Sequence, residues 1–266
     1  QHRRAIEINP NYARGHHWYA FHLMMEGRFE EGIEQMLRTR ELDPLSPSVL
    51  QAVGWCYYQA RRFAESIQTF QNMLDAVPDF PYGLVTFSWA LRHVGESEKA
   101  IKVAEKALDL SGGSQFYLAV LGSTYAAAGK HTEARAVREQ LIQMSVHSYV
   151  SPYHLALMHL HLGERGRALE LLLNAHAIRD AWVVWLGVEP QFDPLRGEPA
   201  FEGILRDLRH PALYRKLEKK KAAAAEKKKK HRSRIAPITT QILMPTPDTQ
   251  AGENEEARQL YTAGRY

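Results

Sequence analysis

The stretch GRFEEGI, residues 27–33, places a glycine between two runs whose apolar spacing is that of helices. The position of its first glycine recurs every 34 residues along the chain. The residues found there are Gly27, Arg61, Gly95, Gly129 and Gly163. Prolines keep the same spacing at Pro10, Pro44 and Pro78. A period of this length, without an insertion, predicts a repeat architecture and so decides the fold class.

Two further columns of this repeat hold small residues. The first consists of Ala20, Gly54, Ser88, Gly122 and Ala156, and the second of Gly32, Ser66, Ala100, Ala134 and Ala168. Small side chains at fixed places indicate points where two helices cross, because a larger side chain there would push the backbones apart. The glycine suits the turn between helices, and the proline suits the end of the second helix. Each unit is therefore expected to be a pair of antiparallel helices.

These columns resemble those of the tetratricopeptide repeat. Five units cover residues 13–182 and begin at Ala13, Pro47, Pro81, Gln115 and Tyr149. The terminal proline is replaced in the last three units by Gly112, Val146 and Asp180. The resemblance implies an all-α, right-handed solenoid of helix pairs with a 34-residue period. Its first helices would line a concave face that binds peptides.

The two ends of the chain resemble incomplete units. Residues 1–12 have the pattern of a second helix, and residues 255–266 have that of a first helix with Gly264 at the turn. On this pattern we expect the chain to be a fragment of a longer protein.

A capping segment is expected over residues 183–213, with a short amphipathic helix that carries Phe201 and Leu205 and has Pro199 in its first turn. Such a segment covers the last apolar face of a repeat array. It resembles the end of arrays in multidomain bacterial regulators, where they accompany winged-helix, Ser/Thr kinase or cyclase domains. That resemblance implies a regulatory context.

The net charge of +4 is unevenly distributed. Residues 214–234 form a low-complexity run with eleven Lys and Arg but two Glu, and a linker follows over residues 235–254. The run is interpreted as a solvated linker, as a salt-sensitive contact with nucleic acid or another anionic surface, or as a nuclear address in a eukaryote. The residues that would make an anionic contact are Lys219, Lys220, Lys221, Lys227, Lys228, Lys229, Lys230 and Arg232.

No motif in the sequence indicates catalysis. Phosphate-binding loops, dinucleotide fingerprints and nucleophile elbows are missing. None of the thirteen histidines has the zinc-protease spacing, and Cys56 is interpreted as a buried structural thiol. No apolar run approaches the roughly 20 residues needed to cross a bilayer. We therefore expect no enzyme activity, no metal and no cofactor, and a cytoplasmic protein, or a nuclear one in a eukaryote.

The resemblance also implies which residues face the groove. At the unit positions that usually point into it stand Phe21, Met24, Trp55, Tyr58, Tyr82, Trp89 and Arg92. Trp, Tyr and Arg often dominate binding energy, although the same rings could instead pack between neighbouring helices and only stabilise the array. The Lys and Asn with which chaperone-binding members hold a terminal carboxylate are missing, so an apolar or amphipathic ligand is expected.

The sequence thus predicts a non-catalytic scaffold that binds a protein or peptide in its groove, with Trp55 and Trp89 as anchors, within a larger regulatory protein. The alternative is a regulatory module of a transcription factor or kinase. In that case the basic tail would contact nucleic acid, or residues 235–244 would dock into the groove. The oligomeric state stays open.

Overall fold

The computed structural model describes residues 2–208 and residue 226. The chain divides into two units, residues 1–216 and 217–266, and the description below concerns the first. The features predicted for residues 209–225 and 227–266, which include the basic run, the linker and the last incomplete repeat, lie outside the described residues.

The described part of the chain is an array of paired helices without strands, which confirms the predicted fold class. Its helices are α1 (His2–Ile8), α2 (Ala13–Met25), α3 (Phe29–Leu42), α4 (Pro47–Gln59), α5 (Phe63–Ala76), α6 (Pro81–His93), α7 (Ser97–Leu110), α8 (Gln115–Ala127), α9 (His131–Met144), α10 (Pro152–His161), α11 (Arg165–Ala177) and α12 (Pro199–Asp207). Two 3₁₀ helices, η1 (Ala181–Trp185) and η2 (Pro190–Leu195), lie between α11 and α12. Among these helices, none is long and apolar enough to span a membrane.

The small residues lie where the two helices of a repeat cross. A Cβ added to Gly54 would lie 2.6 Å from Cε1 of Phe70, and one added to Gly122 would lie 2.7 Å from Cγ1 of Val137. Ser66 Oγ donates a hydrogen bond to the carbonyl oxygen of Gly54, 2.8 Å away. The close approach that the sequence columns predict is therefore present, and it lets each pair bury its apolar faces.

The turns inside the repeats use the left-handed backbone conformation. Gly27, Gly95, Gly129 and Gly163 have φ values between 70° and 82°. Arg61 takes the same conformation with φ of 62°, although it has a side chain. A non-glycine residue in this region costs about 1 kcal/mol or more, so its side chain should have a compensating role.

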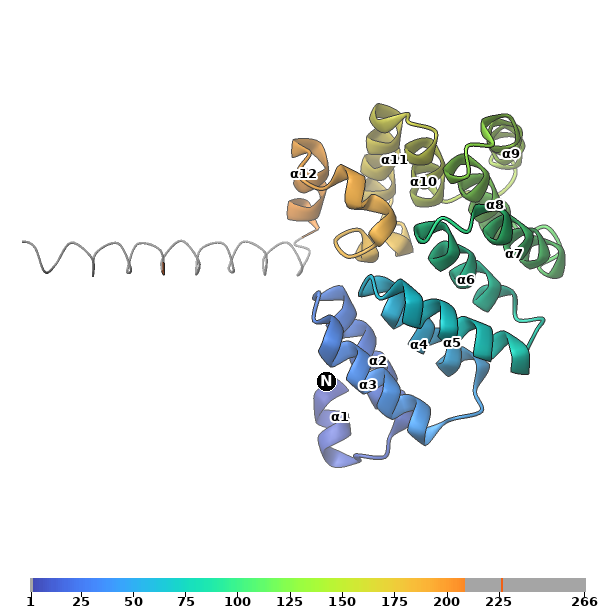
Figure 1. Cartoon of the computed structure of the whole chain (residues 1–266). Helices are drawn as coiled ribbons and strands as arrows, with labels where there is room; N and C mark the ends of the chain where they lie inside the picture. Colours follow the sequence, from blue (N-terminus) through green and yellow to red (C-terminus); the bar gives the residue numbers. More distant parts are fainter. Residues whose placement is uncertain (1, 209–225, 227–266) are drawn as a thin grey trace, which may run out of the picture. The chain divides into compact units, whose positions relative to one another are not determined.

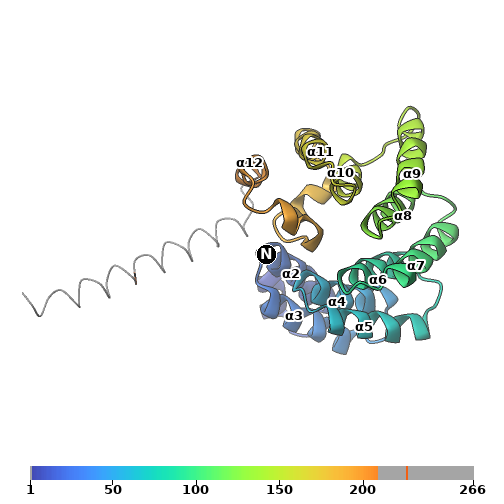
Figure 2. The same ribbon diagram turned by 45° about the horizontal axis from the view of Figure 1, so that its top comes forward.

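Successive helix pairs follow a curve (Figures 1 and 2). The first helices of the repeats, α2, α4, α6, α8 and α10, are each in contact with the next one. In both views the stretch between α11 and α12 lies on the inner side of this curve.

The C-terminal part of the array is covered as predicted. Helix α12 begins at Pro199 and buries Phe201, Ile204 and Leu205 in one cluster with Phe192 and side chains of α10 and α11. The same cluster extends into η1 and η2. The capping segment therefore does more than close the last repeat, because part of it continues along the inner face.

Candidate functional site: a concave face that holds residues 181–196

The candidate site is the inner face of the array together with residues 181–196, called here the inner segment. Trp185 of η1 meets the two aromatic rings that the first and second repeats turn inward. Its ring centroid lies 6.0 Å from that of Phe21 and 4.7 Å from that of Trp55, both edge to face. Trp182 stacks on Phe116 of α8 at 5.5 Å. The inner segment thus contacts aromatic side chains of the first, second and fourth repeats.

A buried carboxylate forms the polar centre of the face. Tyr58 Oη donates a hydrogen bond of 2.6 Å to Oε1 of Glu189, and Gln59 Nε2 donates one of 3.0 Å to Oε2. Both donors come from the end of α4. Glu189 is 4% exposed, and Gln191 adds donations from its backbone N and Nε2 at 3.3 and 3.1 Å. A carboxylate is buried at acceptable cost only when it is hydrogen-bonded in this way. Burial and the charge of Glu189 raise the pKa of the Tyr58 hydroxyl well above its ordinary value, so Tyr58 remains a donor.

Arg92 of α6 lies beside this carboxylate. It donates hydrogen bonds to Oγ of Ser123, at 3.2 Å, and to Oε1 of Gln191. Burial lowers the pKa of Arg92, while the neighbouring Tyr58 and Glu189 oppose that shift. Gln191 therefore bridges the guanidinium and the carboxylate. Its contacts connect the third repeat to the inner segment.

Arg61 holds the same segment from the turn of the second repeat. Its guanidinium donates to Asp193 through Nη2 at 2.7 Å and through Nε at 3.2 Å, and its Nη1 reaches the carbonyl oxygen of Val188 at 3.0 Å. Burial would raise the pKa of Asp193, but hydrogen bonds from Arg61 and Arg196 hold it below its ordinary value. These bonds are the compensating role that the left-handed backbone of Arg61 calls for.

The residues predicted to face the groove fall into three groups. Four of them contact the inner segment directly, namely Phe21, Trp55, Tyr58 and Arg92. Tyr82 and Trp89 lie alongside, with ring centroids 6.2 Å from Phe116 and 6.0 Å from Tyr58 respectively. Met24 is fully buried at the crossing with α3, where its Cε would lie 2.7 Å from a Cβ on Gly32, so it is not part of the inner face.

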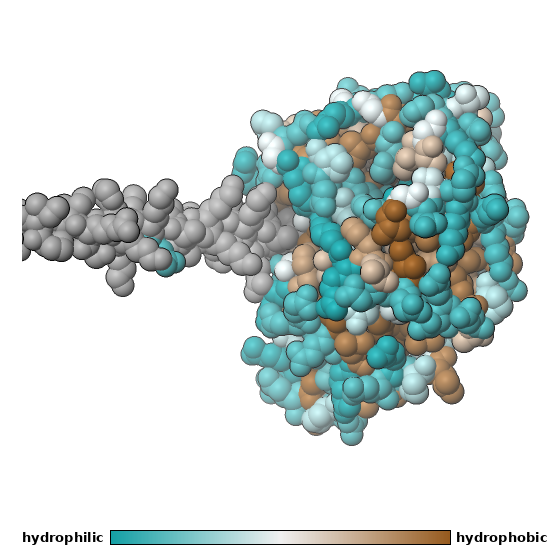
Figure 3. Space-filling view, in the orientation of Figure 1, coloured by the Kyte–Doolittle hydropathy of each residue, from teal (hydrophilic) through white to brown (hydrophobic). Residues whose placement is uncertain are grey.

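Part of the inner face stays open. A pocket of about 330 Å³ lies between the starts of α8 and α10 and the ring of Trp182. It is lined by Ser114, Gln115, Phe116, Ala119, Tyr149, Val150, Ser151, His154 and Trp182. His154 is buried, its Nε2 lacks a partner in the described structure, and burial lowers its pKa to about 4. In the space-filling view, apolar side chains show through the middle of a largely hydrophilic face (Figure 3).

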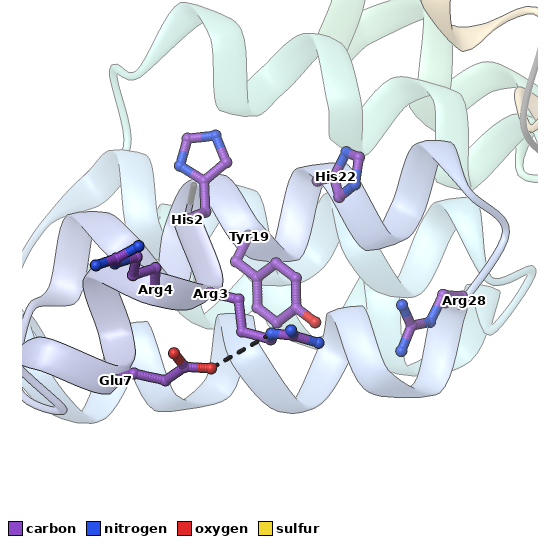
Figure 4. A pocket seen from close by; sticks show the side chains of 7 residues that line it. All are labelled: His2, Arg3, Arg4, Glu7, Tyr19, His22 and Arg28. Atoms are coloured by element: carbon purple, nitrogen blue, oxygen red, sulfur yellow. Dashed lines mark ion pairs between the residues drawn. The ribbon is translucent and has the colours of Figure 1, made fainter.

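A second pocket, of about 630 Å³, lies at the other end of the array (Figure 4). It is lined by His2, Arg3, Arg4, Glu7, Tyr19, His22 and Arg28. The basic side chains there are largely neutralised, since Arg3 pairs with Glu7 at 3.4 Å and Arg28 with Glu26 and Glu31. This pocket therefore lacks the excess of positive charge that an anion site needs.

Two expectations about chemistry concern the described residues. Within residues 2–208 and 226, no group of three or more His, Cys, Asp and Glu is placed to hold a metal ion. Cys56 is buried and unpaired, and burial raises the pKa of its thiol, which suits packing rather than nucleophilic attack.

Sequence reasoning missed the inner segment. It assigned residues 183–213 to a cap and left Glu189, Gln191 and Asp193 without a role. Two signals pointed to it. Trp182 and Trp185 are large aromatic residues at and just beyond the end of the last repeat, and Arg61 is a charged residue in a column of glycines.

Comparisons with known proteins agree with this architecture. A family model described as tetratricopeptide repeat matches residues 22–81. The tetratricopeptide repeat-containing protein trd-1 of Caenorhabditis elegans is 29% identical over 106 residues, which are 40% of this chain and 14% of trd-1. The chain thus spans a small part of that relative's length.

Two solved structures have a similar fold. TTC0263, a thermophilic TPR protein in Thermus thermophilus, gives a TM-score of 0.52 at 18% identity over 64% of this chain and 94% of its own. The APC/C hetero-tetramer Cut9-Hcn1 gives 0.51 at 16% identity over 77% of this chain and 38% of the other. Residues 22–81 thus match the tetratricopeptide repeat, and the described array of helix pairs has a fold similar to that of these two structures.

Proposed function

We propose that the chain is a non-catalytic scaffold that docks a segment of a partner protein on its concave face, within a larger regulatory protein. One observation carries the proposal. This face already holds a stretch of non-repeat polypeptide through side chains of several repeats, with a tryptophan and a carboxylate as its main contacts. A surface that binds one such segment has the chemistry to bind another.

The open pocket beside Trp182 is the accessible part of this face. Its walls are apolar at Phe116, Ala119 and Val150, and its rim carries the hydroxyl groups of Ser114 and Ser151. An apolar side chain can enter such a pocket while the backbone around it bonds to the rim. The partner is therefore an apolar or amphipathic segment rather than a highly charged one.

A peptide-display selection on the immobilised full chain tests this proposal. Selected peptides are then measured by fluorescence anisotropy on the wild type, on Ser114→Trp, which fills the pocket, and on Thr132→Trp, an exposed control on α9. We expect affinity to fall at least about tenfold on Ser114→Trp and to stay unchanged on Thr132→Trp. Equal affinity for all three proteins, or a selection that yields no binder, would contradict docking at this face.

The alternative function through the basic tail depends on residues outside the described ones, Lys219 and Lys227 among them, and stays a prediction. The cytoplasmic or nuclear location stays one as well.

A further inference from the structure

The inner segment occupies the part of the concave face where sequence reasoning expected a partner. We propose that residues 181–196 are an intramolecular ligand of this face, and that the partner it takes carries an aromatic side chain followed by a carboxylate, which replace Trp185 and Glu189. This inference rests on the proposed docking function and specifies its ligand.

The place where Glu189 binds, called here the carboxylate seat, selects for an acceptor because the side chains around it are hydrogen-bond donors. Tyr58 Oη and Gln59 Nε2 each donate to a different oxygen of Glu189, at 2.6 and 3.0 Å. With Glu189 removed, Gln59 Nε2 would lose its acceptor and Tyr58 Oη would keep only its longer contact with His93 Nε2, at 3.4 Å, and an unpaired buried donor is costly. A replacing segment must therefore bring an acceptor with two oxygens to this place, and a carboxylate meets that need.

The aromatic seat lies next to the carboxylate seat. It consists of Phe21 and Trp55, whose rings contact the half-buried Trp185 edge to face. The aromatic contact continues outward through Trp18, which is 47% exposed and lies 5.8 Å from Phe21 between ring centroids. An incoming aromatic side chain can therefore meet this seat from solvent before Trp185 leaves it.

Arg61 binds the inner segment through a side chain that the turn of the repeat does not require. Four other repeats have glycine at this turn, which adopts the left-handed conformation without strain. The second repeat keeps Arg61 at a positive φ, and its guanidinium binds Asp193 and Val188 of the inner segment. Within the repeats the same side chain donates from Nη1 to the carbonyl oxygen of Gln59, at 2.6 Å, and lies over the ring of Phe29, but its two bonds to a carboxylate go to Asp193 of the inner segment.

Charge also favours an acidic ligand. The guanidinium groups of Arg61 and Arg92 both lie against the inner segment. Arg61 pairs with Asp193, and Arg92 binds Gln191 beside the charge of Glu189. Release of the segment would leave both arginines uncompensated. A partner with one or two carboxylates restores the balance, whereas a basic segment is repelled.

The test uses the full chain and a labelled synthetic peptide of residues 181–197. Two variants weaken the internal contact: Trp185→Ala/Glu189→Gln acts on the segment, and Arg61→Gly removes its anchor while it restores the residue usual at this turn. Ala181→Ser, at an exposed position of η1, is the matched control. Circular dichroism verifies the helix content of each protein.

We expect the peptide to bind Trp185→Ala/Glu189→Gln at least about tenfold more tightly than the wild type or Ala181→Ser. Arg61→Gly loses the same bonds to Asp193 in the peptide and in the internal segment, so it should bind the peptide about as tightly as the wild type. In the wild type and the control, the internal segment competes at an effective concentration in the millimolar range. A peptide with Glu189→Gln should bind the weakened variants about tenfold more weakly than the native peptide. If Trp185→Ala/Glu189→Gln keeps its helices and binds no peptide, or binds both peptides equally, the proposal is overturned.

Hydrogen exchange on the wild type gives a second reading that needs no variant. Amides of residues 183–196 should exchange through a local opening, faster than amides of α4 and α6. If the amides of residues 183–196 exchanged only through global unfolding, as those of α4 and α6 do, the segment would be a permanent part of the core. That result would overturn the proposal. Both experiments concern the chain's own inner segment. Their failure would therefore leave the proposed docking function intact wherever the display selection finds a partner.

Discussion

At Gly54 the two helices of the second repeat approach so closely that a single methyl group has no room. An added Cβ would lie 2.6 Å from Cε1 of Phe70, whose ring is fully buried. We expect Gly54→Ala to lower the free energy of unfolding by about 1–3 kcal/mol, because the ring or the backbone must shift. Urea denaturation followed by circular dichroism measures this change.

Gly166 of α11 is the matched control, since an added Cβ there meets no atom within 4 Å. Gly166→Ala should leave stability unchanged or raise it by up to about 1 kcal/mol through helix propensity. If both substitutions had the same effect, the small column would not mark a tight crossing.

Single residues also set the limit of what sequence could predict. The small columns follow from sterics alone, so the sequence predicts that Gly54 and Ser66 lie at helix crossings. The contacts of Glu189 depend on a partner about 130 residues away in sequence, Tyr58. No local pattern encodes such a pair. The misfit of Arg61 in its column and the tryptophans at the end of the array, Trp182 and Trp185, are the signs of a distant contact in the sequence.

Among the elements, α12 carries the clearest test of the cap. Phe201 is fully buried, 6.1 Å from Phe192 between ring centroids. Phe201→Ala should lower the free energy of unfolding by about 3–5 kcal/mol, because it opens a cavity between α12 and the last repeat. Arg206→Ala, on the exposed side of the same helix, should change it by less than about 0.5 kcal/mol. Chemical denaturation of the two variants checks the difference, and equal midpoints would mean that α12 does not cover a core.

The elements differ in how far their sequence predicted them. Helix α12 has Pro199 at its start and apolar residues at helical spacing, so both its start and its buried face were predicted. The inner segment has neither the 3.6-residue period nor the 34-residue period, because its two 3₁₀ helices and the bends between them follow the surface on which they lie. Its place on the inner face therefore could not be read from periodicity.

On the scale of the whole described array, the inner segment changes how the repeats depend on one another. In an ordinary solenoid each repeat contacts only its neighbours, so stability is nearly a sum of local contributions. Here Trp185, Glu189 and Asp193 connect the C-terminal end of the array to the first and second repeats. The repeats are thereby coupled over a long sequence distance. Loss of the inner segment should loosen the curve of the array as well as expose the face.

The response of the array to acid follows from its buried histidines. Burial lowers the pKa of His154 to about 4 and that of His161 to about 3, against about 6.5 in an unfolded chain. Between pH 6.5 and 4 the unfolded chain therefore binds more protons than the folded one. Folding stability should be fully present above pH 6.5 and should fall as the pH drops through this window, by up to about 1.4 kcal/mol per pH unit for each histidine.

Urea midpoints at pH 7, 6 and 5 measure this slope, and His154→Phe isolates the share of one residue. Phenylalanine keeps a ring against Phe116 and Trp182 but binds no proton, and Nε2 of His154 has no hydrogen bond to lose in the described structure. The variant should therefore lose stability less steeply on acidification than the wild type. Because carboxylates titrate in both proteins alike, the difference between the two slopes belongs to His154. Parallel slopes would mean that this histidine is not buried in its neutral form, and the packing of α10 against Trp182 would have to be looser than the structure has it.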